Sequence, residues 1–519
     1  MKKINLLQWT FSMVLVVFAI GFSACTDLDD VVEDGLREEV VDRETLPLPS
    51  DPAAALQTAY NQLNGFTDQT GLFAMMEHTS DELIGPTRGT DWSDFGVWRQ
   101  LHSHQWSNDH RDVVDEFRDI SAAYFQATQV IAATTDVSLL AQARFLRGFF
   151  MMYMVDLFGQ VPFREATEGA AILPRVISRA DATTMVIEDL EFAIANLPDF
   201  EDGIIGRASK QAAEAVLMKV LLNKGVWTAD NPAGPYNFED ADMDRVISLA
   251  DDIESSGFFA LEPAGEYFDI FSPDNTTNSD EPIFGITNDV GNNRGNTRNR
   301  VYMTVHYNQN PSGWNGFSTL SGFYNKFDQD DERLGTDYPG VTDESGLRAG
   351  FLIGQQFDQD GTALTDRAGA PLAFTPEVDL LYSNEVNGIR VIKYTPDYGD
   401  LENPGNDYVF VRYADVVLMA AEAHLRKGEN ADALALVNEI RGNRGVDDLT
   451  SIDEMTLLDE RGFELYWEGW RRQDQIRFGT FLGTWDAKPE ASPEAALLFP
   501  IPLVQLNVNS NLRQNPGYN

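Results

Sequence analysis

The only cysteine of this 519-residue chain is Cys25. A lone cysteine has no intramolecular disulfide partner, so the chain cannot use the disulfide framework of small secreted domains and must be held together by a hydrophobic core. The composition allows a large core, because 43% of the residues are hydrophobic and 11% are aromatic. We therefore expect a large protein that folds by burying apolar surface.

The residues before Cys25 resemble a bacterial lipoprotein signal. Lys2 and Lys3 form a basic start, and residues 11–22 are largely apolar. This apolar run is too short for a membrane span, which needs roughly 20 residues, but it suits a secretory signal. Small residues directly precede Cys25, as in a lipobox. We predict a signal peptide over 1–24 and acylation of Cys25 as a membrane anchor. The alternative is a cleaved secretory signal followed by an incidental cysteine.

An acidic stretch follows the cysteine. Residues 26–39 carry many Asp and Glu and few apolar side chains, which predicts an extended, solvated tether over 25–50. The stretch also resembles the export signal of lipoproteins on the outer face of the outer membrane. The formal charge of −44 argues against nucleic acid as a partner and against direct docking on anionic lipid.

Helical patterns dominate both ends of the remaining chain, about 51–265 and 407–519, and a loop-rich segment of about 266–406 separates them. This segment is rich in Asn, Asp, Gly and Pro and contains short strand-like runs at 281–286 and 301–305. The helices that we predict span 53–63, 136–158, 181–197, 209–223, 242–254, 409–427, 430–441 and 451–478.

A faint internal repeat links the two helical regions. We predict that the helix containing residues 213–217 ends at Gly225 and that the helix containing residues 421–425 ends at Gly428. A second amphipathic helix follows each of them. Helix pairs of roughly 34 residues with this pattern are typical of tetratricopeptide-like stacking. The fold class that we predict is therefore mostly α, a tetratricopeptide-like helix-pair scaffold with an inserted loop-rich region.

Several motifs, in order, resemble the SusD/RagB family. They are residues 143–147, 157–162, 412–423, 438–441, 459–471, 499–502 and 515–518. The resemblance implies one helical domain over 51–519, with four tetratricopeptide-like units and a variable ligand side. It also implies a partner, a SusC-like TonB-dependent barrel in the outer membrane. Family members bind oligosaccharides or, in some cases, peptides, and the resemblance implies neither catalytic residues nor a cofactor.

The segment 79–106 suggests where a glycan would bind. Sugars present apolar C–H faces that stack on indole rings, and a rim of hydroxyls that Asp, Asn or Arg can bind. The glycan-binding residues that we predict here are Asp81, Arg88, Asp91, Trp92 and Trp98, with Trp106 a weaker choice. The alternative is that these tryptophans fill the helical scaffold.

A second aromatic lies in the polar loop 310–317. Trp314 stands between glycines and has few sequence neighbours to pack against, so we predict that it also contacts glycan. Tyr302 and Tyr307 are weaker candidates, because ordinary strand packing also explains them.

Three other groups of residues could suggest catalysis or metal binding, and we reject each of these interpretations. Glu464 and Glu468 could be read as a glycosidase pair, but arginines at 461 and 471 share their helical spacing, which predicts ion pairs along one face. His102, His104 and His110 match no strong zinc pattern, and hydrogen-bonded histidines beside Trp106 are the better interpretation. The run 358–361 begins like a calcium loop, but Gly369 occupies the position of the twelfth-residue Glu.

These observations predict a lipoprotein of the cell outer membrane that faces the exterior, binds glycan and delivers it to a SusC-like transporter. The acidic surface favours a neutral glycan over a polyanion. Two alternatives stay open: the same architecture binding peptides, as in the RagB-like branch, and a surface glycoside hydrolase.

Overall fold

The computed structural model describes residues 45–201, 203–288 and 295–518. Of the described residues, those of 47–168 and from 173 onward belong to one compact unit. All helices and strands below belong to this unit. The acylation predicted at Cys25 and most of the predicted acidic tether lie outside the described residues. Within these residues, no helix combines the length and apolarity that crossing a bilayer would require.

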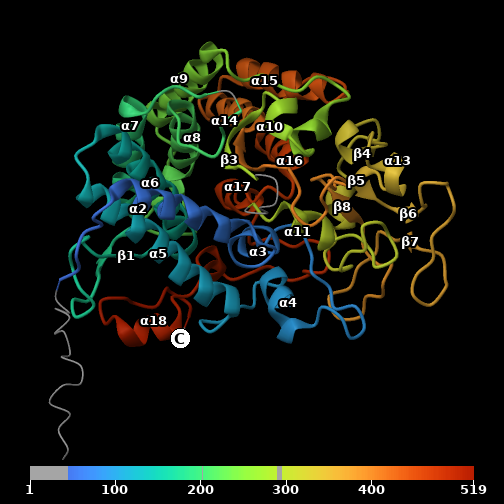
Figure 1. The fold of residues 1–519 in the computed structure, drawn as a ribbon, viewed down its shortest axis with the longest axis horizontal. Coiled ribbons are helices and arrows are strands. Elements are labelled where there is room, and N and C mark those ends of the chain that lie inside the picture. Colours follow the sequence, from blue (N-terminus) through green and yellow to red (C-terminus); the bar gives the residue numbers. More distant parts are fainter. Residues whose placement is uncertain (1–44, 202, 289–294, 519) are drawn as a thin grey trace, which may run out of the picture. The chain divides into compact units, whose positions relative to one another are not determined.

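The secondary structure is mostly helical (Figure 1). The helices are α2 (Pro52–Asn61), α3 (Gly71–Glu77), α4 (Val97–His102), α5 (Arg111–Ala133), α6 (Val137–Phe158), α7 (Arg179–Asn196), α8 (Lys210–Trp227), α9 (Asp240–Ser256), α10 (Asn275–Asn278), α11 (Thr297–Tyr302), α12 (Ser321–Tyr324), α13 (Thr342–Ser345), α14 (Tyr413–Arg426), α15 (Asn430–Asn443), α16 (Glu454–Leu465), α17 (Arg471–Arg477) and α18 (Leu503–Val508). The strands are β1 (Val161–Phe163), β2 (Arg175–Ile177), β3 (Pro282–Ile286), β4 (Gly335–Thr336), β5 (Ala349–Leu352), β6 (Gly354–Gln355), β7 (Ala373–Phe374), β8 (Arg390–Ile392) and β9 (Tyr408–Arg412).

Successive helices stack in pairs. The helix α5 packs on α6, α6 on α7, α7 on α8 and α8 on α9, and α14 then continues the stack by packing on both α9 and α15. More than 150 residues separate α9 from α14 in the sequence, yet the two helices are neighbours. This arrangement confirms a helical scaffold into which a loop-rich segment with small antiparallel sheets is inserted.

Two predicted helices begin at the caps that the sequence indicated. The Asp136 side chain accepts hydrogen bonds from Ser138 and Leu139 at the start of α6, which ends at Gly159 in the left-handed conformation (φ 68°). Ser209 caps α8 through the Ala212 N–H, but the predicted end at Gly225 is wrong, because α8 continues to Trp227. Side-chain caps satisfy N–H groups that have no partner within the helix, so these polar residues determine where each helix begins.

Three predictions are wrong in part. Residues 409–412 belong to the buried strand β9, which pairs with β3, so the helix predicted from 409 begins only at Tyr413. The helix predicted over 451–478 is two helices, because Trp467 (φ 60°) and Gly469 (φ 86°) adopt the left-handed conformation between α16 and α17. The strand predicted at 301–305 is instead the end of α11 and a turn. The strand predicted at 281–286 is confirmed as β3.

A buried ion network joins the inserted segment to the scaffold. Glu464 on α16 accepts hydrogen bonds from Arg333 Nη1 (3.0 Å), Arg412 Nη1 (2.7 Å) and Arg444 Nη2 (2.8 Å). All four side chains are 0% exposed. Burial alone would raise the pKa of Glu464, but the three guanidiniums hold it well below its usual value. Arg412 and Arg444 also bind Glu281 at 2.8 and 2.7 Å, so the network includes the residue just before β3.

The charges at 461–471 therefore do not pair along one helical face, as the sequence predicted. Arg461 binds Asp474 and Asp415, and Arg471 binds Asp81. The break between α16 and α17 puts Arg461 and Arg471 on separate helices, and the carboxylates that bind them come from elements other than α16. Glu464 and Glu468 are buried in this network, which gives the supposed glycosidase pair a structural role.

Removing Glu464 should destabilise the protein strongly, because three buried guanidiniums would lose a shared carboxylate. We expect Glu464→Ala to lower the free energy of unfolding by about 3–5 kcal/mol, as measured by urea denaturation. The control is Glu165→Ala, which removes an exposed pair with Arg175 and should cost about 0–1 kcal/mol. Equal effects of the two substitutions would contradict a dependence on the network.

Candidate functional site

Three loops lie side by side and form what we call the loop face, residues 84–96, 312–319 and 379–389. Backbone hydrogen bonds join them: Ile84 and Ser318 exchange two (2.9 and 3.0 Å), Thr87 N–H donates to the Leu380 carbonyl (3.0 Å), and Thr319 N–H donates to that of Ile389 (2.9 Å). In Figure 1 the loop face lies between α4 and the strands β6 and β7. Segments far apart in the sequence therefore form one surface.

The Arg88 guanidinium braces this surface from within. It donates from Nε to the Gly316 carbonyl (3.1 Å), from Nη1 to the carbonyls of Asn384 and Asn387 (2.7 Å each), and from Nη2 to Ser318 Oγ (2.7 Å). Burial lowers the pKa of Arg88 to about 9, which leaves the side chain charged at neutral pH. We predicted that Arg88 contacts glycan, but the structure places it beneath the surface, where it joins the loops.

An aromatic cluster supports the loops. Trp98 is 3% exposed, stacks on His78 (ring centroids 5.1 Å apart) and contacts Phe317 (5.1 Å). Trp92 lies outside this pair, half-buried, with its ring 5.0 Å from Phe317. A Cβ at position 316 would collide with the Trp92 ring, so Gly316 is required there. Of the two predicted indoles, Trp98 therefore belongs to the core and Trp92 is the one that reaches the surface.

Trp314 lies next to Trp92. The Trp92 Nε1–H donates to the Trp314 carbonyl (2.8 Å), and the Trp314 ring is half-buried against Tyr302 (5.9 Å). The structure thus brings Arg88, Trp92, Trp98 and Trp314 together, as a shared site requires. Trp106, the weaker choice, is 6% exposed and donates to the Tyr518 hydroxyl (2.7 Å).

Polar groups border the aromatic rings. Asp91 accepts hydrogen bonds from Arg367 Nη2 (2.9 Å) and from the Tyr307 hydroxyl (3.0 Å), and the Arg367 guanidinium lies 4.0 Å from the Tyr307 ring centroid. The hydrogen bond from Arg367 lowers the pKa of Asp91. Asp81, in contrast, is bound by Arg471 at 2.7 and 3.0 Å in the scaffold, where its carboxylate holds α17.

The two most exposed aromatic side chains of the loop face are residues that we did not predict. Phe95 is fully exposed and Tyr382 is 84% exposed. Phe95 has a left-handed backbone (φ 55°), and Trp92 and Asp94 also have positive φ. Such strained residues are held in place by their surroundings and cluster at functional sites. Here the Trp98 Nε1–H binds Asp94 Oδ2 (2.7 Å) and fixes the loop that presents Phe95.

The arrangement suits a sugar chemically. Exposed rings at Phe95 and Tyr382 offer apolar faces for stacking, and Asp91 and Arg367 offer an acceptor and donors for hydroxyl groups. A signal for both rings was present in the sequence: each is a single aromatic among turn-forming residues, Asp94 and Gly96 for Phe95, and Ser383 and Asn384 for Tyr382.

The three neighbouring histidines do not form a metal site. The ring nitrogens of His102 lie near the carbonyls of Leu83 and Asp486, and its single N–H donates to one of them. His104 binds the Thr79 carbonyl and Ser492 and lies 5.1 Å from the Trp106 ring. His110 binds the Val97 carbonyl. Within the described ranges, the one group with metal-like geometry is His424, Glu429 and Asp432, in which Glu429 already binds Lys427 and His424.

The buried imidazole of His102 should make stability depend on pH. Burial lowers its pKa to about 4, below the 6.5 of an exposed histidine, so the unfolded chain binds the extra proton. The stability that comes from neutral His102 is complete above pH 6.5 and is lost as pH falls toward 4.

As pH falls from 6.5 toward 4, we expect the difference between the unfolding free energies of the native chain and of His102→Gln to shrink by about 1.4 kcal/mol per pH unit. Urea denaturation at several pH values measures this difference, in which the contributions of the other titrating groups cancel. Parallel curves for the two proteins would contradict the assignment.

Comparison with known proteins agrees with this architecture. The SusD family model matches residues 382–518. The starch-binding protein SusD of Bacteroides thetaiotaomicron is 26% identical over 419 residues, 73% of this chain and 72% of that protein. A SusD-like protein from Bacteroides fragilis has the same fold (TM-score 0.69, 20% identity, 90% of this chain and 96% of that one). A laminarin-binding SusD-like protein gives a TM-score of 0.66 at 20% identity, over 91% of this chain and all of that one.

Proposed function

We propose, for a chain that belongs to the SusD family, that the loop face binds glycan and that the protein captures it for uptake. The observation that carries the proposal is the pair of exposed rings, Phe95 and Tyr382, on loops that Arg88 holds together. An exposed aromatic ring costs free energy in water unless a ligand covers it. The starch-binding and laminarin-binding relatives support a sugar as that ligand.

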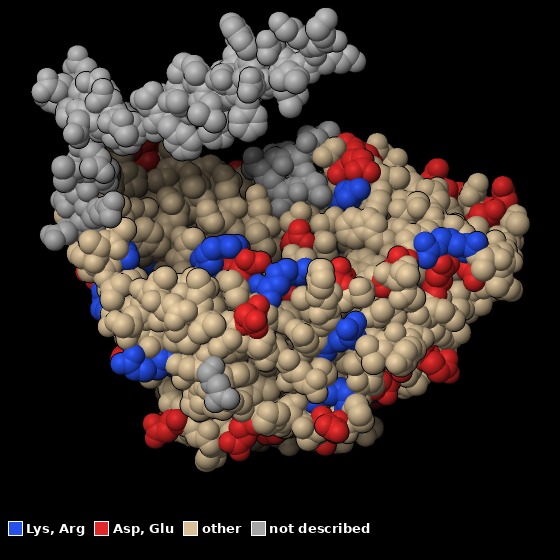
Figure 2. All heavy atoms as spheres, turned by 90° about the horizontal axis from the view of Figure 1, so that it is seen from below, with Lys and Arg blue, Asp and Glu red and all other residues tan. Residues whose placement is uncertain are grey.

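The glycan that we propose is neutral. Asp91, Asp94, Asp379 and Glu385 lie on the loop face, and the chain carries a formal charge of −44. On the face drawn in Figure 2, acidic side chains are scattered and Lys and Arg form no continuous patch among the described residues. A polyanion would meet repulsion without a compensating basic surface. We also propose binding without hydrolysis, because Glu464 and Glu468 are closed off in the ion network and the relatives are named for binding.

Truncating the exposed rings should weaken glycan binding and leave the fold intact. We expect Phe95→Ala and Tyr382→Ala each to reduce affinity for a matching oligosaccharide by roughly 5- to 150-fold, by analogy with bases stacked on aromatic rings. Calorimetry with malto- and laminari-oligosaccharides measures the affinity, and thermal unfolding should change little.

The matched control is Phe258→Ala. Phe258 is also an exposed phenylalanine (37%), but it packs beside Phe200 and Phe259 in the scaffold. Its truncation should leave glycan affinity unchanged. Normal binding by both loop variants would place the glycan elsewhere, and binding of peptides instead of glycans would favour the RagB-like alternative.

We further propose that acylated Cys25 anchors the protein to the outer membrane, facing the exterior, and that a SusC-like TonB-dependent barrel receives the glycan. The support is the lipobox-like sequence before Cys25 and the family resemblance. An acyl anchor fits a chain that has no membrane-crossing helix among its described residues.

Replacing Cys25 should release the protein from membranes. We expect Cys25→Ala to lose labelling by a fatty-acid analogue and to leave the membrane fraction, because the lipid attachment site is gone. Unchanged labelling would contradict the anchor. Mild-detergent extraction of the native membrane fraction tests the partner: recovery together with a large barrel supports it, and recovery of the chain only as a monomer counts against it.

A further inference from the structure

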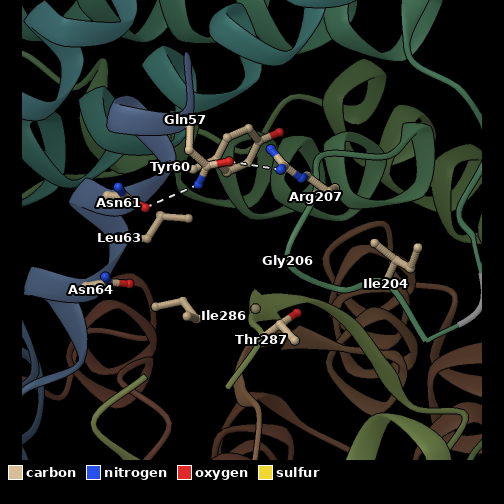
Figure 3. A pocket seen from close by; sticks show the side chains of 11 residues that line it. Gln57, Tyr60, Asn61, Leu63, Asn64, Ile204, Gly206, Arg207, Ile286 and Thr287 are labelled. Carbon is tan, nitrogen blue, oxygen red and sulfur yellow. Dashed lines mark hydrogen bonds between the residues drawn. The ribbon is translucent and has the colours of Figure 1, made fainter. Parts of the chain in front are cut away.

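A cavity of about 400 Å³ opens between the N-terminal helix and the end of β3, in a part of the fold that the loop face does not include. Its walls are α2 with the turn after it, the segment Ile204–Arg207, and residues 285–287 (Figure 3). The volume lies within the roughly 300–1,000 Å³ of small-molecule sites. Leu63 and Ile286 give the cavity an apolar side, next to Asn61 and Asn64.

A chain of hydrogen bonds runs along one wall. Arg207 Nη2 donates to Gln57 Oε1 (2.9 Å), and Gln57 Nε2 donates to Asn61 Oδ1 (3.2 Å), as the dashed lines in Figure 3 show. A guanidinium has no acceptor atom, so it dictates the direction of the whole chain. Gln57 must turn its oxygen to Arg207 and its nitrogen to Asn61, and Asn61 must turn its oxygen to Gln57.

The Arg207 guanidinium lies 4.9 Å from the Tyr60 ring centroid, and Tyr60 is fixed in turn by Gln142 (3.0 Å) and the Ala208 N–H (3.0 Å). The guanidinium is thus held in place before any ligand arrives, which reduces the ordering cost of binding.

The charge around the cavity has the opposite sign to that of the protein. The chain has 82 Asp and Glu against 38 Lys and Arg, yet no described residue that lines the cavity is acidic. Arg207 has no carboxylate partner in the described part of the chain, although most arginines of this protein form ion pairs there. A guanidinium without a carboxylate, on the wall of a cavity whose described lining has no acidic side chain, matches a ligand carboxylate, which accepts several hydrogen bonds.

We propose that this cavity is a second ligand site, separate from the glycan-binding loop face, and that it binds the carboxylate of a small polar molecule through Arg207. Such a carboxylate occurs on an acidic sugar and at the C-terminus of a peptide. The apolar side at Leu63 and Ile286 would contact the ring or side chain that carries it. The site does not depend on the function proposed for the loop face.

Matched probes that differ only in the carboxylate test this site on the full chain. The pairs are galacturonic acid with galactose, and acetyl-alanyl-alanine with its C-terminal amide, each titrated by calorimetry and ligand-observed NMR. We expect at least one acid to bind and its uncharged counterpart not to. Binding of only one of the two acids identifies the source as sugar or peptide, and added salt should weaken it.

Arg207→Gln should reduce this binding by roughly 10- to 150-fold, as expected when a hydrogen bond to a charged group is lost. The control Arg348→Gln removes another exposed arginine, which pairs with Asp337, and should have no effect. Phe95→Ala and Tyr382→Ala should also leave it unchanged, which separates this site from the loop face. Equal binding of acid and uncharged probes, no binding by any probe at millimolar concentration, or native affinity in Arg207→Gln would overturn the proposal.

Discussion

The structure depends on one buried carboxylate. Glu464 receives guanidiniums from three places in the chain: Arg333 in the inserted segment, Arg412 at the end of β9, and Arg444 after α15. An isolated charge in such a dry interior would be very unfavourable, so each member is stable only while the others are in place. The network thereby couples the helical scaffold to the inserted segment.

The scaffold was largely predictable from the sequence because local rules determine it. Apolar spacing and end signals such as Asp136, Ser209 and Gly159 located helices whose structure agrees with them. The errors arose where tertiary contacts override local pattern. Residues 409–412 continue the helical pattern of residues 413–427, but they pair with β3 and form a strand. The left-handed turn at Trp467 has no local sequence signal and depends on tertiary packing.

The candidate site was predictable only in part, for a different reason. Composition pointed to residues 84–96, which form part of the loop face, and Trp92 and Trp314 do meet there. What composition cannot tell is which way a side chain faces. Arg88 and Trp98 turn inward, and Asp81 serves an ion pair with Arg471. Phe95 faces outward because a backbone of positive φ puts it there, and a single phenylalanine in a turn carries no periodicity that would indicate this.

The brace at Arg88 has a consequence for how such a surface can evolve. Three of its four acceptors are main-chain carbonyl oxygens, those of Gly316, Asn384 and Asn387. Every amino acid supplies the same carbonyl, so the brace depends on the path of the backbone and on no particular side chain that accepts there. Asn384 and Asn387 fix that path, because the Asn384 side chain accepts the N–H groups of Val386 and Asn387, and the Asn387 side chain accepts that of Asn384. Exposed neighbours such as Tyr382 can therefore be exchanged while the arginine keeps the loops in register.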